Sequence, residues 1–220
     1  MTFHVITLFP EMFDSYLGES ILKRAQESGL VSVSFYNPRD FSKDAHKSVD
    51  DTPYGGGPGM VMMVDPIVQA WEKANSQPFL SKLFSHKKIK TYILSPGGKQ
   101  FTTQVAKSDS KNYTDIILIC GRYEGIDSRV LAVTGAEELS IGDFVVTGGE
   151  LPAMVAIDSI ARQIPGVLGK FESLEEERIS SHEMYTRPEH YEYKEKKYSV
   201  PEVLVSGNHK KIEEYKKSSR

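Results

Sequence analysis

Stretches with the composition of buried β-strands run directly into glycine-rich loops at three places in this sequence of 220 residues. They are TYILSPGGK at 91–99, DIILICGRYEGID at 115–127 and ELSIGDFVVTGGELPA at 138–153. In open α/β sheets, ligands bind beyond the carboxyl ends of the strands, where glycine lets the backbone approach them closely. None of the loops spells the G-x-G-x-x-G or G-x-x-x-x-G-K-[ST] pattern of the common nucleotide sites. The sequence therefore predicts a ligand cradle of another kind.

The first part of the chain alternates strand and helix patterns. TFHVITLF at 2–9 reads as a strand, apolar residues then recur at helical spacing from Pro10 until Gly29, and LVSVSFY at 30–36 alternates as a second strand. Strand, helix, strand is the unit from which a parallel sheet is built. A further helix is expected from Asp65. We therefore predict an α/β fold, with a parallel sheet covered by helices on both faces.

Length and composition set the outer bounds. A chain of 220 residues that is 39% hydrophobic can form one substantial domain with a smaller appendage. It has no apolar run near the ~20 residues of a membrane-spanning helix and no leader pattern, so we expect a cytoplasmic protein with no membrane partner. The single Cys120 excludes an internal disulfide and is interpreted as an apolar strand end, and no spacing predicts a metal site.

The charge balance narrows the class of partner. A formal net charge of −3 and a pI near 6.1 are not those of a protein coated in positive charge for nucleic acid. DNA is not expected as a partner, and RNA binding would need a local basic surface.

Residues 37–59 follow neither the helical nor the strand period and end in a run with four glycines and two prolines. A stretch of this length without secondary structure is functional or disordered. Phe41, Val49 and Tyr54 lie inside it and the apolar GMVMMV follows, which favours a functional loop.

The most regular helix pattern begins at Pro152 and ends before Pro165 and Gly166. Counted at 100° per residue, Asp158 and Arg162 lie together on one side of it. Taken alone, such a pair is typical of a surface ion pair that contributes about 0.2–0.5 kcal/mol.

After Gly169 the sequence contains few aliphatic residues and many charges, so a domain boundary is expected there. We predict a domain at 1–168, an interdomain linker at 169–187 that is ordered by a partner or disordered, and a small, mostly helical domain at 188–220. The last of these is too short to bury a core of its own and must dock on something.

The motifs together resemble one family. PRDF (38–41), VDDTPYGGGPGM (49–60), LSPGGK (94–99), CGRYEGID (120–127), SIGDFVVTGGELPAM (140–154), IPGVLG (164–169), YTRP (185–188) and VLVSGNH (203–209) resemble the bacterial tRNA (guanine-N1)-methyltransferases of the SPOUT class. The resemblance implies a homodimer that uses S-adenosylmethionine to methylate N1 of the guanine on the 3′ side of the tRNA anticodon. It also implies a trefoil knot around the cofactor, which general rules of chain connection make very rare.

The resemblance further implies which residues contact S-adenosylmethionine. An adenine ring needs apolar walls and backbone hydrogen bonds, which the three loops can supply. The implied contacts are Ile93, Leu94 and Pro96 from the first loop, Gly121, Tyr123 and Glu124 from the second, and Ile141, Gly142, Asp143, Phe144, Val145, Val146, Gly148, Gly149 and Pro152 from the third.

Guanine N1 carries a proton, so its methylation requires a general base, and the negative charge that develops on O6 requires a cation or a donor. The family assigns these roles to an aspartate and an arginine. The arginine corresponds to Arg162, and the base corresponds to Glu177, with Glu175 or Glu176 as alternatives if the register differs. Solvated linker charges are the other reading of these acids.

For the RNA, the resemblance implies contacts from the glycine-rich N-terminal loop and from the C-terminal part of the partner subunit. Asp50 is the candidate for a base-edge contact, and Arg39, His46 and Lys47 are candidates for phosphate contacts. The family usually continues with a further basic helical stretch after VLVSGNH, so we expect a shortened C-terminal tRNA-binding domain.

Two alternative functions are considered. One is a catalytically silent RNA- or cofactor-binding protein with the same fold, which the glutamate at 177 and the short C-terminus would favour. The other is a sister enzyme that methylates a ribose hydroxyl or another base. PYGGGPGM and YTRP argue against the second, because those motifs belong to the guanine-N1 enzymes.

Overall fold

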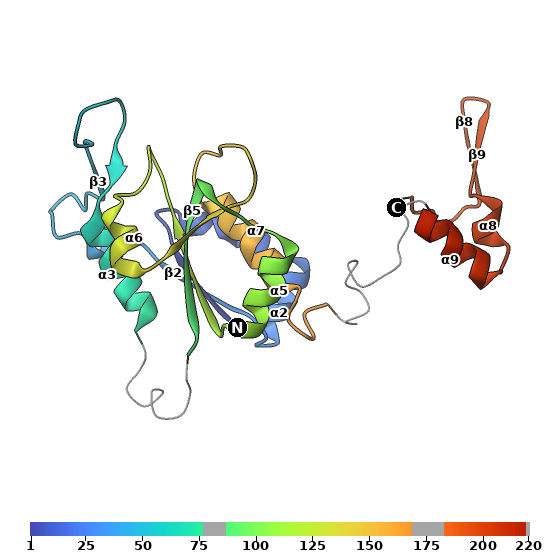
Figure 1. Cartoon of the computed structure of the whole chain (residues 1–220), viewed down its shortest axis with the longest axis horizontal. Coiled ribbons are helices and arrows are strands. Elements are labelled where there is room, and N and C mark those ends of the chain that lie inside the picture. Colours follow the sequence, from blue (N-terminus) through green and yellow to red (C-terminus); the bar gives the residue numbers. More distant parts are fainter. Residues whose placement is uncertain (77–86, 169–182, 219–220) are drawn as a thin grey trace. The chain divides into compact units, whose positions relative to one another are not determined.

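The computed structural model describes residues 1–76, 87–168 and 183–218. The chain divides into two compact units, Met1–Leu168 and Gly169–Arg220, and Figure 1 draws both. The first unit contains the main sheet, and the second contains a hairpin and two short helices.

A parallel sheet of five strands forms the centre of the first unit, in the order β2-β1-β6-β5-β7. All neighbouring strands in it pair in parallel. The strands are β1 (Thr2–Ile6), β2 (Ser32–Tyr36), β5 (Ile89–Gln100), β6 (Asp115–Cys120) and β7 (Glu137–Ser140). Every residue of β6 is buried, as expected for a central strand with both faces covered.

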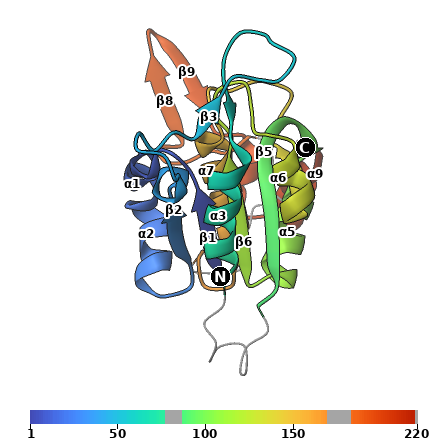
Figure 2. The same cartoon turned by 90° about the vertical axis from the view of Figure 1, so that its left-hand side faces the viewer.

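Alternate residues of the strands point into two separate hydrophobic cores. Ile116 and Leu118 belong to one core, which α2 (Ser20–Glu27), α5 (Thr103–Asn112) and α7 (Glu150–Ala161) help to form. Ile117 and Ile119 belong to the other, under α3 (Val64–Asn75) and α6 (Arg129–Thr134). Figure 2 looks onto the face that α3 covers. The predicted parallel sheet with helices on both faces is thus confirmed.

The helices are all short. Within the described ranges, no helix is long and apolar enough to cross a membrane.

The helix expected between Pro10 and Gly29 is wrong as a single element. The structure instead has a 3-10 turn η1 (Pro10–Phe13), a short helix α1 (Asp14–Leu17) and then α2. The break falls at Gly18, where a Cβ would lie 2.6 Å from the carbonyl oxygen of Asp14. The periodicity of the apolar residues continues across the break because both helices pack on the same core.

Residues 37–59 are mostly irregular, as the missing periodicity predicted. They contain the 3-10 turn η2 (Pro38–Phe41), which the Asn37 side chain caps by accepting from the N–H of Arg39, and the short strand β3 (Asp50–Asp51). β3 pairs antiparallel with β4 (Val61–Met62). Val49 is fully buried and anchors the loop in the core beneath α3.

The second unit has less helix than predicted. It contains an antiparallel hairpin of β8 (His190–Tyr193) and β9 (Lys196–Ser199), followed by α8 (Glu202–Val205) and α9 (His209–Ser218). The hairpin at 190–199 lies inside the predicted small domain, which was expected to be mostly helical. Part of the predicted linker is described as well, and there Glu183 accepts hydrogen bonds from Tyr185 and Tyr215. The bond to Glu183 raises the pKa of Tyr185 to about 12.

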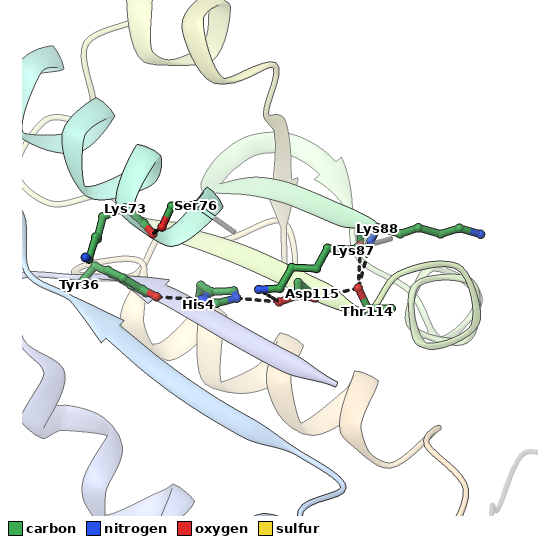
Figure 3. A network of polar contacts seen from close by, with 8 residues as sticks. All are labelled: His4, Tyr36, Lys73, Ser76, Lys87, Lys88, Thr114 and Asp115. Atoms are coloured by element: carbon green, nitrogen blue, oxygen red, sulfur yellow. Dashed lines mark hydrogen bonds and ion pairs between the residues drawn. The ribbon is translucent and has the colours of Figure 1, made fainter. Parts of the chain in front are cut away.

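A buried polar network lies where β6 begins, at the edge of the sheet opposite the glycine-rich loops. His4 is held between the Tyr36 hydroxyl (3.1 Å) and the carboxylate of Asp115 (2.9 Å), as Figure 3 shows. The same carboxylate pairs with Lys87 at 3.1 Å and accepts from Thr114 at 2.7 Å. Burial alone would raise the pKa of Asp115, but the bonds from His4, Thr114 and Lys87 outweigh it, and the pKa is lowered.

Candidate functional site

The three glycine-rich loops meet around one cavity of about 510 Å³ at the carboxyl ends of β5, β6 and β7. The structure therefore brings together segments that lie between residues 93 and 152 of the chain. Most of the predicted cofactor contacts line it: Ile93, Leu94, Pro96, Gly121, Tyr123, Glu124, Ile141, Phe144, Val145, Val146, Gly148, Gly149 and Pro152. Gly142 and Asp143 belong to the same loop but are not among the lining residues.

Several lining residues were not predicted. They are Ser95, Arg122, Gly125, Ile126, Asp127, Ser128, Leu131, Glu138, Leu139, Ser140 and Thr147. Most of them are neighbours of predicted residues within the same loops. A prediction that every residue of each loop lines the cavity would have included them. Leu131 lies on α6, and its contribution depends on how that helix packs beside the loops.

Two glycines lie where the backbone leaves no room for a side chain. A Cβ on Gly149 would lie 2.6 Å from Cys120 Cα, and a Cβ on Gly98 would lie 2.5 Å from the backbone of Glu138 and Leu139. Gly149 also donates its N–H to the carbonyl of Gly121 at 2.9 Å. The second and third loops thus cross in direct backbone contact at the cavity wall.

A buried carboxylate lies beside this crossing. Glu150, in the first turn of α7, is 0% exposed. Its Oε1 accepts from the Thr7 hydroxyl at 2.7 Å, and its Oε2 lies 2.9 Å from Arg122 Nε as an ion pair that lacks the alignment of a hydrogen bond. Carboxylates are favoured at helix N-termini, where the backbone dipoles are positive. The burial of nearby Cys120, together with the charge of Glu150, raises the pKa of its thiol.

Arg122 links three segments of the chain. Besides its pairing with Glu150, its Nη1 donates to the carbonyl of Thr147 at 3.4 Å and its Nη2 to the sulfur of Met12 at 3.1 Å. Its guanidinium carbon also lies 4.5 Å from the centre of the Phe9 ring. Both cavity loops are therefore fastened to each other and to the segment after β1.

The N-terminal glycine-rich segment adjoins the second loop through its backbone. Met62 donates to the carbonyl of Gly125, Glu124 donates to that of Met60, and Asp127 donates to that of Met62, all at 2.9–3.0 Å. Because Asp50 pairs with Met62 across β3 and β4, this candidate base contact is held near the cavity loops.

The candidate phosphate contacts lie elsewhere in residues 37–59. Arg39 is half-buried and donates to the carbonyl of Lys47 at 3.4 Å, whereas the His46 and Lys47 side chains are exposed. The Asp44 carboxylate accepts from the N–H groups of His46 and Ser48 and so shapes the turn. The bonds from Ser48 lower the pKa of Asp44.

Arg162 caps the carboxyl end of α7 and is not among the residues that line the cavity. Its Nε is buried and has no hydrogen-bond partner among the described residues. The surface pair with Asp158 that the spacing predicted is not among the ion pairs of the described chain. Burial, together with the negative charge of Asp158, raises the pKa of Tyr16.

The second predicted catalytic residue, Glu177, lies outside the described residues, as do Glu175 and Glu176. In the part of the chain that the structure describes, no three His, Cys, Asp or Glu side chains are grouped so that they could hold a metal ion.

Comparison with known proteins gives one consistent result. The family model described as tRNA (Guanine-1)-methyltransferase TrmD matches residues 1–220. A tRNA (guanine-N(1)-)-methyltransferase of Caldanaerobacter subterraneus subsp. tengcongensis is 51% identical over 221 residues, which cover 99% of this chain and 86% of that protein. Proteins of the same name from Clostridioides difficile and Pseudoalteromonas atlantica are 48% and 46% identical, over 99% and 97% of this chain and 91% and 78% of theirs.

Proposed function

Because the chain belongs to the tRNA (guanine-1)-methyltransferase family, we propose that it transfers a methyl group from S-adenosylmethionine to N1 of the guanine on the 3′ side of the tRNA anticodon. One observation carries the proposal. Three loops with the family's motifs, which are separate in sequence, line a single cavity at the carboxyl ends of parallel strands. This is the place where α/β folds bind ligands.

The cavity fits S-adenosylmethionine in size and in chemistry. A volume of about 510 Å³ is within the ~300–1,000 Å³ of small-molecule sites. Ile93, Leu94 and Leu139 offer apolar walls for an adenine ring, and the loop backbones offer donors and acceptors. The predicted lining residues from Ile93 to Pro152 would hold the cofactor. When bound, it supplies a methyl group on a positively charged sulfur, which is already electrophilic.

The chain's own residues must remove the proton from guanine N1, since that nitrogen has no free lone pair until it is deprotonated. We assign this role to the carboxylate of Glu177, with Glu175 and Glu176 as the alternatives. A glutamate has the same charge as the family's aspartate and one more methylene.

We assign to Arg162 the stabilisation of the negative charge that develops on guanine O6. A guanidinium with a buried Nε that has no described partner has a donor to offer, and donors stabilise developing charge most strongly where water is excluded. The role of Arg162 is therefore electrostatic.

A homodimer is the assembly that we propose for the active site. Arg162 follows the cavity residue Pro152 by ten positions along α7, a rise of about 15 Å. One chain therefore does not place both at the same point. Met12, Tyr16, Leu151 and Val155 are large exposed apolar residues from η1, α1 and α7, three elements that pack together. Exposed apolar patches of this kind mark interaction sites, and a second copy bound there could bring Arg162 to the partner's cavity.

The trefoil knot is part of the same proposal. It is supported by the tight crossing of the second and third loops, where Gly149 contacts Cys120 and Gly121 without space for a side chain.

We further propose that residues 1–168 form the knotted cofactor-binding domain and 188–220 the small tRNA-binding domain, with Asp50 at the base edge and Arg39, His46 and Lys47 at phosphates.

The test is methyl transfer from S-adenosylmethionine to two tRNA transcripts that differ only in guanine or adenine on the 3′ side of the anticodon. Methylation of the guanine transcript alone is the expected result. Methylation of both, or of a ribose, would instead indicate a sister activity. Intact cofactor binding without transfer to either transcript would indicate a catalytically silent binding protein.

Two variants assign the roles. Glu177→Gln should abolish transfer while S-adenosylmethionine still binds, and full activity in that variant would transfer the role to a neighbouring acid. Arg162→Met should lower kcat with little change in cofactor affinity, because the guanidinium is assigned to guanine O6 and not to the cofactor.

A further inference from the structure

One face of the β8–β9 hairpin is built almost entirely from aromatic rings. In the register of the two strands, Tyr191 lies opposite Tyr198 and Tyr193 lies opposite Lys196. Residues opposite each other point to the same face, and residues two apart along a strand share that face. The face therefore carries three tyrosines and one lysine, and we call it the tyrosine face.

The opposite face has a different composition. His190 lies opposite Ser199, and Glu192 lies opposite Lys197. The acid and base of the second pair lie directly across from each other. Glu192, the acidic residue of the two strands, therefore lies on the face without tyrosines. The charged strand residue on the tyrosine face is Lys196.

The turn between the strands adds one lysine and one glutamate at the tip. Lys194 and Glu195 form a two-residue connection, both with positive φ (45° and 63°), as a type I′ turn requires. Lys194 Nζ lies 5.4 Å from the centre of the Tyr193 ring, and Lys196 Nζ lies 5.2 Å from that of Tyr198. Cations and ring faces are thus already side by side.

The tyrosine face is exposed. Tyr191, Tyr193 and Tyr198 are 59%, 53% and 48% exposed, and every residue of both strands is classed as exposed. An isolated two-stranded hairpin is marginally stable in water, so three large rings without a core to pack on require another explanation.

We propose that the tyrosine face binds the unpaired bases of the tRNA anticodon loop by stacking, with Lys194 and Lys196 on the adjacent phosphates; this inference rests on the proposed function. Aromatic rings stack with any base, and lysines track the backbone. Charge complementarity selects this occupant, because RNA presents flat π-faces and negative charge together, whereas an acidic peptide presents only the charge. Bases in a duplex are already stacked, so a loop is preferred.

The test uses the full-length chain and two fluorescent RNAs: an anticodon stem-loop with guanine 3′ of the anticodon, and a fully paired duplex of the same base composition. Tyr191→Ala/Tyr198→Ala should weaken stem-loop binding by about tenfold or more, as base stacking on aromatics predicts. Duplex binding and S-adenosylmethionine affinity should stay as in the parent chain. The matched control is Glu192→Ala/Lys197→Ala, which removes a neutral pair from the opposite face and should leave both RNA affinities within about twofold.

Two further variants protect the test against a hairpin that fails to form. Tyr191→Phe/Tyr198→Phe keeps the rings and should bind the stem-loop as the parent chain does. Lys196→Glu should weaken binding and flatten its dependence on salt, since one phosphate contact is lost. Unchanged stem-loop affinity in the alanine variant would overturn the proposal. Loss of the dimer in that variant would also overturn it, because the tyrosine face would then be a contact between subunits.

The outcomes separate this inference from the proposed function. If the parent chain methylates tRNA and the alanine variant does so with the same KM for tRNA, the tyrosine face is not the contact while the function stands. If the parent chain binds the stem-loop through this face but transfers no methyl group, the surface stands and the assigned reaction fails.

Discussion

Two buried carboxylates at opposite edges of the sheet have similar partners and different consequences. Asp115 (3% exposed) is held by His4, Lys87 and Thr114 where β6 begins, and Glu150 (0% exposed) is held by Arg122 and Thr7 where β6 ends. The Asp115 network joins β1 and β6 with the residues that precede β5. The Glu150 network joins two loops that line the cavity. A buried ion pair therefore acquires a functional role from the segments that it connects.

Arg122→Met is expected to have the largest effect, because it leaves the Glu150 carboxylate buried without its cation. Removing one partner of a buried pair lowers the free energy of unfolding by about 3–5 kcal/mol. Because Arg122 also fastens both cavity loops, S-adenosylmethionine affinity should fall by more than about tenfold, or about 1.4 kcal/mol. Chemical denaturation and isothermal titration calorimetry measure the two effects.

The double variant Arg122→Met/Glu150→Leu separates stability from positioning. Replacing both members of a buried pair by apolar residues is often neutral for stability. The unfolding free energy should therefore largely recover while the cofactor affinity stays low. Recovery of both quantities would mean that the pair contributes stability alone and does not position the loops.

Asp115→Asn is the matched variant at the other edge of the sheet. It removes the charge that His4 and Lys87 share, and hydrogen bonds to charged groups contribute about 1.5–3 kcal/mol. We expect a comparable loss of unfolding free energy with S-adenosylmethionine affinity unchanged, measured at a temperature where the variant is fully folded. An equal fall in affinity would make the cavity loops sensitive to any loss of stability and would remove the contrast between the two networks.

Thr7→Val tests the weaker half of the Glu150 network. This variant removes the hydroxyl that donates to Glu150 Oε1 and keeps the ion pair between Glu150 and Arg122. We therefore expect a smaller loss of about 1–2 kcal/mol in unfolding free energy. Thr7→Ser keeps the hydroxyl and should restore most of it. Serine lacks the threonine methyl that valine keeps, so a Thr7→Ser variant no more stable than Thr7→Val would mean that packing of the methyl contributes at least as much as the hydrogen bond.

The sequence predicted local features well and long-range pairings poorly. Strand composition and the glycine loops predicted the sheet and most residues of the cavity, because both depend on neighbours along the chain. The pairing of His4 with Asp115 joins residues 111 positions apart, and that of Arg122 with Glu150 depends on how two loops cross. Neither leaves a local pattern. The β8–β9 hairpin was missed because Lys194 and Glu195 occupy a turn where glycine or asparagine is the usual signal.

The smallest expected effect is the pH dependence that distinguishes Asp115. Its partners hold the pKa of Asp115 in the folded protein below the ordinary value of an aspartate. A carboxyl with a lowered pKa in the folded state binds its proton more readily when the chain is unfolded, so its contribution to stability is present above pH ~4 and is lost as the pH falls through the folded pKa. The difference in unfolding free energy between the parent chain and Asp115→Asn should therefore be constant near neutral pH and shrink below pH ~4. Thr7→Val keeps Asp115, so the contribution of Asp115 cancels in the difference between that variant and the parent chain. A parallel decline of that difference below pH ~4 would assign the acid sensitivity to the whole fold instead of to the Asp115 network.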